Sequence, residues 1–143
     1  EDFARLHPGG AIGRDLLMKV GEIMRPRSAI PLCKPETSVA KALAQITAKR
    51  CGAAVVVDPR GKLLGIYTHG DFARGYQKDP EIGRRTLREV MTKNPVTIPV
   101  DSLAAKALHV FETHRIEDLI VLDAARRPVG LVDSQDLARF RLY

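Results

Sequence analysis

Apolar residues recur along the chain with two spacings, one typical of helices and the other of buried strands. The helical spacing places four apolar side chains on one face: Val39, Ala42, Leu43 and Ile46. Continuous apolar stretches follow at 53–57 and 62–67, separated by a turn at 58–61 that contains Pro and Gly. Short apolar runs bounded by turn residues indicate strands that are buried on both faces or packed beneath helices. This part of the chain is therefore predicted to form a helix followed by a two-stranded hairpin.

The same order of patterns returns in the second half of the chain. The helical positions there are Ala104, Ala107, Leu108 and Phe111. Strands are predicted at 119–122 and 128–132, with a turn at 123–126 between them.

Each of these first helices is expected to follow a short extended piece, at 28–32 in the first half and at 95–99 in the second. Thr37 and Ser102 stand where the helices should begin. A hydroxyl at that place can accept a hydrogen bond from an unpaired backbone N–H, so both residues are predicted N-caps.

The two halves form an internal repeat at a spacing of 65 residues. Over the 41 positions from 38 to 78, 11 residues are identical to those 65 positions later. Each unit is predicted to run strand, helix, strand, strand, helix. A unit of about 55 residues buries little core alone, so two units should pack against each other. The expected fold is α+β, a pseudo-twofold pair with a cleft where the two sheets meet.

The repeat also sets the expected domain boundaries. The first unit is placed at 20–79 and the second at 87–143, with a linker at 80–86. Residues 1–19 contain a Pro-Gly-Gly break and are interpreted as a linker from another domain. The chain has no initiator Met, and we expect it to be a piece of a longer protein.

Composition narrows the possible functions. The net charge of +6 is spread along the chain rather than gathered in one basic run, and Trp is absent. Scarce aromatic residues argue against a stacking surface for single-stranded nucleic acid, whereas a modest positive charge suits an anionic small ligand. The apolar runs are too short to span a membrane. Cys33 and Cys51 have no metal or redox spacing and are expected to be reduced and mostly buried.

The strongest repeated feature is a strand-to-helix turn, at 65–71 and again at 130–136. Each copy carries an acidic residue near the start of the second helix, Asp71 or Asp136. A helix N-terminus favours phosphate, the Thr68 hydroxyl can donate to a phosphate oxygen, and an ionised Asp71 can accept both hydroxyls of a ribose.

The alternative for Thr68 and Asp71 is structural. Their spacing is that of a capping box, which would only complete the helix start. In the second copy Asp133 replaces Thr68, and two carboxylates repel a phosphate. That half therefore needs a sugar, a base, a cation or a basic neighbour, and we expect one asymmetric site rather than two equal ones.

Other polar residues are weaker candidates for ligand contacts. His69 is either a solvated loop residue or an anion contact, and Arg115 either closes a helix or reaches into the cleft. Thr97, in the second extended piece, is also a candidate ligand contact. The four His residues have no metal-ligand spacing, and neither copy pairs a nucleophile with a base or contains a phosphate-cradling Gly-rich loop. No metal site and no catalytic group are predicted in this chain.

The duplicated turn, preceded in each copy by an apolar strand that ends in Asp, resembles the CBS domain. Residues 20–143 are then similar to a tandem CBS pair, also called a Bateman module. The family pattern has Ser or Thr at the positions of Thr68 and Asp133, and Asp at those of Asp71 and Asp136. The resemblance implies a nucleotide site in the cleft, and the departure at Asp133 weakens it in the second half.

The N-terminal stretch carries a closer resemblance. Asp2-Phe3-Ala4 and the following His7-Pro8-Gly9-Gly10-Ala11 resemble the junction between a sugar isomerase (SIS) domain and the CBS pair in arabinose 5-phosphate isomerases. This resemblance implies a parent enzyme that interconverts ribulose 5-phosphate and arabinose 5-phosphate, in the supply of Kdo for the lipopolysaccharide of a Gram-negative bacterium. His7 matches an isomerase active-site His, but without its domain no catalysis is expected.

These resemblances lead to one main expectation and its rivals. The chain should be a cytoplasmic regulatory module that requires no cofactor and binds CMP-Kdo, or another nucleotide such as AMP or ATP, in the cleft. The candidate contacts are Thr68, His69, Asp71, Thr97, Arg115, Asp133 and Asp136. The rival is a module that serves only assembly, as a homodimer here and a tetramer in the parent. An independent enzyme and a nucleic-acid-binding protein are disfavoured.

Overall fold

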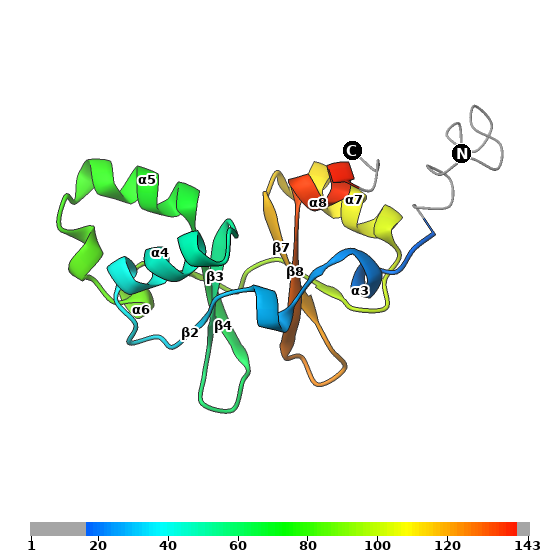
Figure 1. Cartoon of the computed structure of the whole chain (residues 1–143), viewed down its shortest axis with the longest axis horizontal. Coiled ribbons are helices and arrows are strands. Elements are labelled where there is room, and N and C mark those ends of the chain that lie inside the picture. Colours follow the sequence, from blue (N-terminus) through cyan, green and yellow to red (C-terminus); the bar gives the residue numbers. More distant parts are fainter. Residues whose placement is uncertain (1–16, 140–143) are drawn as a thin grey trace.

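The computed structural model describes residues 17–139 and shows two four-stranded sheets side by side, each with helices on its outer side (Figure 1). The first half contains α3 (Val20–Ile23), β1 (Arg25–Pro26), the 3₁₀ helix η1 (Arg27–Ala29), β2 (Leu32–Cys33), α4 (Val39–Ala48), β3 (Ala53–Val57), β4 (Leu63–Thr68) and α5 (His69–Lys78). The second half contains η2 (Ile82–Arg84), α6 (Leu87–Val90), β5 (Thr92–Lys93), β6 (Thr97–Pro99), α7 (Ala104–His114), β7 (Asp118–Leu122), β8 (Pro128–Asp133) and α8 (Ser134–Arg139). The α+β fold expected from the sequence is confirmed.

Each half lends one short strand to the sheet of the other half. The sheets have the orders β2-β3-β4-β5 and β1-β8-β7-β6. Arg25 of β1 pairs with Leu131, and Thr92 of β5 pairs with Ile66, both antiparallel. The sequence predicted two units that pack against each other, and it did not predict this exchange of edge strands.

The central hairpins are apolar except at the strand ends that carry Thr68, Asp118 and Asp133, because their strands are covered on two faces. In β3, Ala54 and Val56 face the helices of the first half, while Ala53 and Val55 belong to a separate core cluster. That cluster also contains Ile120, Leu122 and Leu131 of the second half. Successive strand residues point to opposite faces, so one set packs under helices and the other joins the two sheets.

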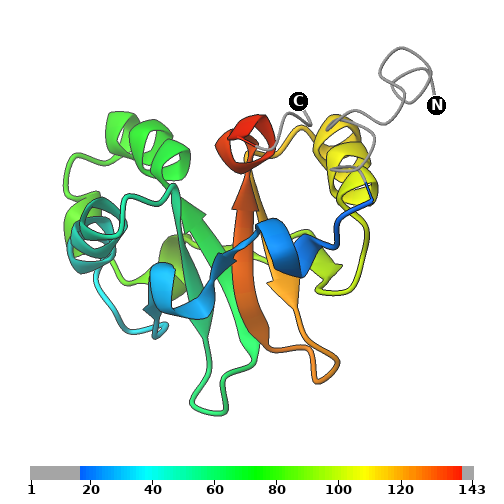
Figure 2. The same cartoon turned by 45° about the vertical axis from the view of Figure 1, so that its right-hand side comes forward.

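Figure 2 shows the two hairpins lying alongside each other and pointing in the same direction, away from α5 and α8. Their tips are linked by a hydrogen bond of 3.1 Å from Arg127 Nε to the Arg60 carbonyl. Because the hairpins lie alongside each other, the starts of α5 and α8 are near one another at the opposite side of the molecule (Figure 2). This is the pseudo-twofold pairing that the repeat indicated.

Two local predictions were wrong at the start of the first unit. Residues 27–29 form a 3₁₀ helix, so the extended piece expected at 28–32 is reduced to Leu32–Cys33. Ser38, not Thr37, caps α4 and accepts a hydrogen bond from the Lys41 N–H. The Thr37 hydroxyl instead accepts from the Lys34 N–H, which tightens the preceding turn.

The corresponding cap of the second unit was also predicted wrongly. α7 begins after Leu103, whose side chain makes no capping bond, rather than after Ser102. The Ala104 N–H donates to the Met18 carbonyl, so the chain before the first unit supplies the acceptor that a side chain would otherwise provide.

Candidate functional site

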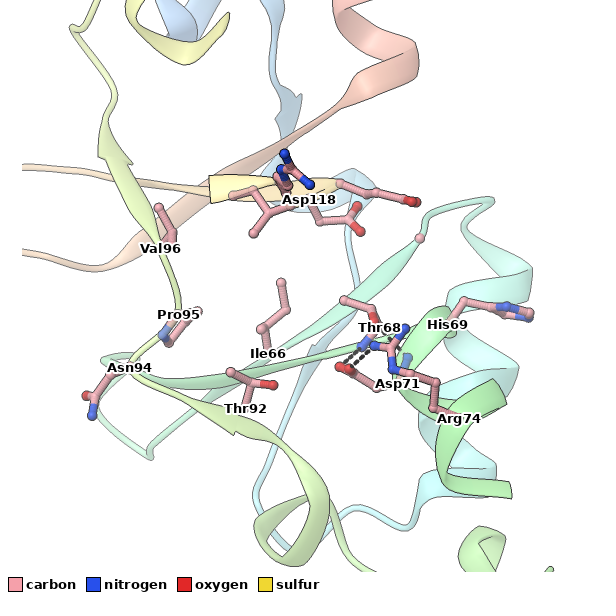
Figure 3. Close-up of a pocket in the computed structure, with 15 residues that line it drawn as sticks. Ile66, Thr68, His69, Asp71, Arg74, Thr92, Asn94, Pro95, Val96 and Asp118 are labelled. Atoms are coloured by element: carbon pink, nitrogen blue, oxygen red, sulfur yellow. Dashed lines mark hydrogen bonds and ion pairs between the residues drawn. The ribbon is translucent and has the colours of Figure 1, made fainter. Parts of the chain in front are cut away.

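A cavity of about 430 Å³ lies between the two halves of the molecule, beside the start of α5 (Figure 3). We call it the inter-repeat cavity. Its lining comes from four segments: Gly52; Ile66, Thr68, His69, Gly70, Asp71 and Arg74; Thr92, Asn94, Pro95 and Val96; and Arg115, Ile116, Glu117 and Asp118. Four predicted site residues therefore share this cavity: Thr68, His69, Asp71 and Arg115.

Thr68 and Asp71 form the capping box that their spacing suggested. The Asp71 N–H donates to Thr68 Oγ1 over 3.0 Å, and the Thr68 N–H donates to Asp71 Oδ2 over 2.9 Å. The other carboxylate oxygen, Oδ1, accepts from Arg74 Nη2 at 2.8 Å. Thr68 and Asp71 thus do cap the start of α5. This cap does not consume the Thr68 hydroxyl proton, which remains a donor because only the oxygen is used as an acceptor.

The N-terminus of α5 offers fewer free donors than a bare helix start. The His69 N–H donates to the Gly52 carbonyl over 2.9 Å, and the Asp71 N–H is used in the capping box. Of these first N–H groups, at most that of Gly70 remains for a ligand. The helix dipole still favours an anion there, but most hydrogen bonds to it must come from side chains.

Three cationic or polar side chains stand around this helix start. His69, Arg74 and Arg115 are all exposed and all line the inter-repeat cavity. Arg115 is the C-cap of α7 and has a left-handed backbone with φ of 52°. That conformation ends the helix and turns the chain so that the next three residues also line the cavity.

Asp133 and Asp136 repeat the capping geometry but lie against an internal cation. The Asp136 N–H donates to Asp133 Oδ1 over 2.8 Å, and the Asp133 N–H donates to Asp136 Oδ2 over 2.9 Å. Arg25 Nη2 is 3.3 Å from Asp133 Oδ2, and Arg25 Nε is 3.4 Å from Asp136 Oδ1. The basic neighbour that these carboxylates required comes from β1 of the first half.

This internal cation makes the two copies of the turn unequal. Arg25 Nη1 also donates to the Arg50 carbonyl over 2.7 Å, so its guanidinium is held on three sides. Asp136 is almost fully buried, and that burial raises the pKa of its carboxyl. Neither Asp133 nor Asp136 lines the inter-repeat cavity.

Thr97 lies between the two halves in a neighbouring cavity, which shares Asn94 and Pro95 with the inter-repeat cavity. This smaller cavity, of about 270 Å³, is also lined by Lys62 and Arg126 near the hairpin tips. Val96 lines the inter-repeat cavity instead, and adjacent residues of an extended chain point in opposite directions. His7 lies outside the described residues.

Asp118 is one of the cavity residues that sequence reasoning missed. It begins β7 and its carboxyl lies beside Gly52, where an added Cβ would be 3.1 Å from Oδ1. Burial raises the pKa of Asp118 to about 7, and the nearby carboxylates of Asp133 and Glu117 add to the effect. The available signal was an acidic residue where the first repeat has the apolar Ala53.

Two further absences hold for the part of the chain that the structure describes. Within residues 17–139, no group of three or more His, Cys, Asp or Glu side chains is placed to hold a metal ion. Over the same residues, no helix has the length and apolar character needed to cross a membrane. Cys33 and Cys51 are both buried and free, as expected.

Comparison with known proteins identifies relatives over nearly the whole chain. It is 42% identical to the arabinose 5-phosphate isomerase KdsD of Pseudomonas aeruginosa, over 97% of this chain and 43% of that protein. It is 39% identical to KdsD of Francisella tularensis, over 99% of this chain and 43% of that protein. The chain thus spans less than half the length of these curated relatives.

Solved structures with the same architecture include complexes with adenine-containing ligands. One is CBSX2 in complex with AMP, 25% identical with a TM-score of 0.73, over 87% of this chain and 96% of that one. Another is the CBS domain pair of MJ0100 in complex with 5'-methylthioadenosine and S-adenosylmethionine, 26% identical with a TM-score of 0.78, over 87% of this chain and 96% of that one. The family model of the CBS domain matches residues 20–78 and 87–143. The repeated fold, its exchanged strands and this match together show that the chain belongs to the CBS domain family.

Proposed function

We propose that this chain is a regulatory module that binds one nucleotide or nucleotide sugar in the inter-repeat cavity. The observation that carries the proposal is the asymmetry between the two repeated turns. At the first, the Thr68 hydroxyl, His69, Arg74 and Arg115 surround an open cavity. At the second, Arg25 is already paired with both carboxylates. Of the two turns, the first lines the inter-repeat cavity and the second does not.

The parts of a nucleotide find matching groups in this cavity. A phosphate is suited to the dipole of α5, the Thr68 hydroxyl and the guanidinium of Arg74 or Arg115. The Asp71 carboxylate can accept from ribose hydroxyls, with its ion pair to Arg74 holding it in place. Apolar contact for a base is available from Ile66, Pro95 and Val96.

The parent protein is proposed to be an arabinose 5-phosphate isomerase of the Gram-negative cytoplasm, as the curated relatives suggest. CMP-Kdo is our preferred ligand, because an end product of the pathway is a natural regulator. It carries a phosphate, a ribose and a sugar carboxylate, and that carboxylate can pair with the guanidinium of Arg115 or accept a hydrogen bond from the ring of His69. AMP and ATP are the alternatives, supported by the AMP complex of the similar CBS pair. The ligand acts on the parent enzyme only if it binds two states of the module with different affinity.

A second candidate function, self-association, is favoured by the surface of α5. This helix has no buried residue, yet Phe72 and Tyr76 lie together on it with ring centroids 5.7 Å apart. Tyr76 is 52% exposed. An aromatic pair on a helix that contributes little to the core suits a homodimer contact. Light scattering of the wild type and Tyr76→Glu tests this: the wild type should be a dimer that Tyr76→Glu dissociates, and a monomeric wild type would exclude it.

Isothermal titration calorimetry with CMP-Kdo, CMP, AMP and ATP tests the nucleotide proposal. At least one ligand should bind the wild type, and Asp71→Ala should weaken that binding by about tenfold or more because the ribose acceptor is lost. Asp101→Ala, a change to an exposed acid that does not line the cavity, should leave binding unchanged. The absence of heat with all four nucleotides at millimolar concentration would overturn the proposal.

A further inference from the structure

Asp118 brings an acidic group into a cavity otherwise suited to an anion. It comes from the second half of the molecule, whereas Thr68, Asp71 and Arg74 come from the first (Figure 3). In the first repeat the equivalent position is Ala53, which is fully buried and apolar. The fold therefore needs no carboxyl at this place, and in the second repeat the acid lines the inter-repeat cavity.

The Asp118 carboxyl is not satisfied by its protein neighbours. Within the described residues, its buried Oδ1 has no hydrogen-bond partner. Arg25 acts on Asp118 as an internal cation, and it forms ion pairs with Asp133 and Asp136 and donates to the Arg50 carbonyl. Its Nε, like Asp118 Oδ1, has no hydrogen-bond partner among the described residues, so the two atoms do not satisfy each other. A buried acceptor without a partner is costly, and native structures leave few of them without a reason.

The charges around Asp118 do not supply the missing donor. Asp133 and Asp136 face it from β8 and α8, Glu117 precedes it, and Arg25 offsets them from β1. On the cavity side, His69, Arg74 and Arg115 stand around the start of α5 with Asp71. The cavity is thus cationic at the α5 end and acidic at the β7 end.

From this arrangement we infer that Asp118 is a specificity-determining residue, whose carboxylate selects ligands that present a hydrogen-bond donor at the β7 end of the cavity. For a nucleotide, the fitting group is the exocyclic amine of cytosine or adenine. The inference rests on the proposed nucleotide site and adds the class of base that the site accepts.

The selection follows from the chemistry of the two partners. An ionised carboxylate can only accept hydrogen bonds. The amine of CMP or AMP donates a hydrogen bond to this carboxylate. The carbonyl of UMP or IMP in the same place is itself an acceptor, so it would face the carboxylate with no hydrogen between them. A site built around such a bond strongly rejects an analogue that lacks the donor, since a buried polar group of the site is then left unpaired. Above pH 7, where Asp118 is ionised, preference for the amine should be greatest.

The test is calorimetric affinity for two matched pairs, CMP against UMP and AMP against IMP, at pH 8. The wild type should prefer the amine-bearing member of the pair it binds by about tenfold or more. Asp118→Asn should reduce that ratio to about threefold or less, because a side-chain amide can offer either an oxygen or an N–H. The control Asp101→Asn should keep the wild-type ratio.

The outcomes separate this inference from the proposed function. If the wild type binds nucleotides but its amine-to-carbonyl ratio is the same in Asp118→Asn, the role of Asp118 is wrong and the nucleotide site stands. If the wild type binds none of the four, the proposed function and the inference both fail. Far-UV circular dichroism of Asp118→Asn verifies that a changed ratio does not come from unfolding.

Discussion

The guanidinium of Arg25 lies 3.3 Å from the carboxylate of Asp133, although the two residues belong to different repeats. Arg25 reaches this place because β1 crosses to the sheet of the second half and pairs beside β8. Its counterpart in the other half is Thr92, at the same position of the exchanged strand β5, which leaves the inter-repeat cavity open. The exchange of strands and the change from Thr to Arg together turn one of two potential sites into an internal ion pair.

Arg25→Met should destabilise the protein by about 3 kcal/mol, near the low end for breaking a buried pair, because the Arg25 side chain is 23% exposed. The substitution removes the ion pairs that Arg25 makes with Asp133 and with the buried Asp136. Urea unfolding at pH 7 measures the change. Arg27→Met is the matched control, since Arg27 is exposed and should lose less than about 0.5 kcal/mol. Equal effects of the two substitutions would show that the ion pair contributes no more than a surface charge.

The raised pKa of Asp118 predicts a definite dependence of stability on pH. The folded carboxyl titrates near 7 and the unfolded one near 3.8, so between these values the unfolded state releases its proton first. The contribution of Asp118 to stability is therefore intact below about pH 3.8 and is lost as the pH rises to about 7.

Asp118→Asn should remove the loss of stability that the wild type shows as the pH rises, because an amide does not ionise. At pH 8 the variant should be more stable than the wild type by roughly 2 kcal/mol, about half of what the pKa shift corresponds to, because the amide must itself be buried. The advantage should shrink toward pH 4. Urea unfolding across this pH range checks the trend, and a stability difference independent of pH would contradict it.

Gly130→Ala should disturb the exchanged strand rather than the hairpin that contains it. A Cβ at Gly130 would lie 2.6 Å from the Arg25 carbonyl and would press on the side chain of Met24. The expected cost is about 2 kcal/mol, as for overpacking in a core. At Gly83 an added Cβ would be 3.8 Å from Ala40, an ordinary contact, so Gly83→Ala should be nearly neutral. Thermal unfolding of both variants compares them directly, and similar melting temperatures would refute the strand-contact explanation.

Periodicity and repetition sufficed to predict the fold class and the central hairpins. The continuous apolar runs predicted strands covered on both faces, which Ala53 to Val57 confirm. The exchange of β1 and β5 was not predictable, because strands of two residues give no period-two signal. The first cap was misplaced by one residue since Thr37 and Ser38 both carry a hydroxyl, and only the tertiary position of the chain decides between them.

The candidate site could be predicted for the groups that lie near one another in the sequence. Thr68, His69 and Asp71 share one turn, and Asp133 signalled the asymmetry that Arg25 explains. Asp118, Arg74 and Thr92 were missed because their approach to the cavity depends on packing between the halves. The sequence could not show that Thr97 lines the neighbouring cavity while Val96 lines the inter-repeat cavity, because the single-residue alternation of an extended segment cannot be assigned without its neighbours.

Thr68 has both a capping role and a proposed binding role, and two substitutions at this position distinguish loss of stability from loss of binding. Thr68→Ala should lower stability by about 1 kcal/mol through loss of the cap, and should weaken nucleotide binding as well. Thr68→Ser keeps the hydroxyl and should retain both properties. Parallel unfolding and calorimetry measure them. A variant Thr68→Ala that is destabilised yet binds nucleotide like the wild type would restrict Thr68 to the cap.

The central claim is that the ligand occupies the first repeated turn and not the second. Backbone amide NMR of the ¹⁵N-labelled chain during titration with the bound nucleotide tests it most directly. The account predicts large shift changes at Gly52, at 68–71 and at 115–118, all in the inter-repeat cavity, with little change at 133–136. Shift changes of equal size at 133–136, or changes confined to the hairpin tips, would contradict it.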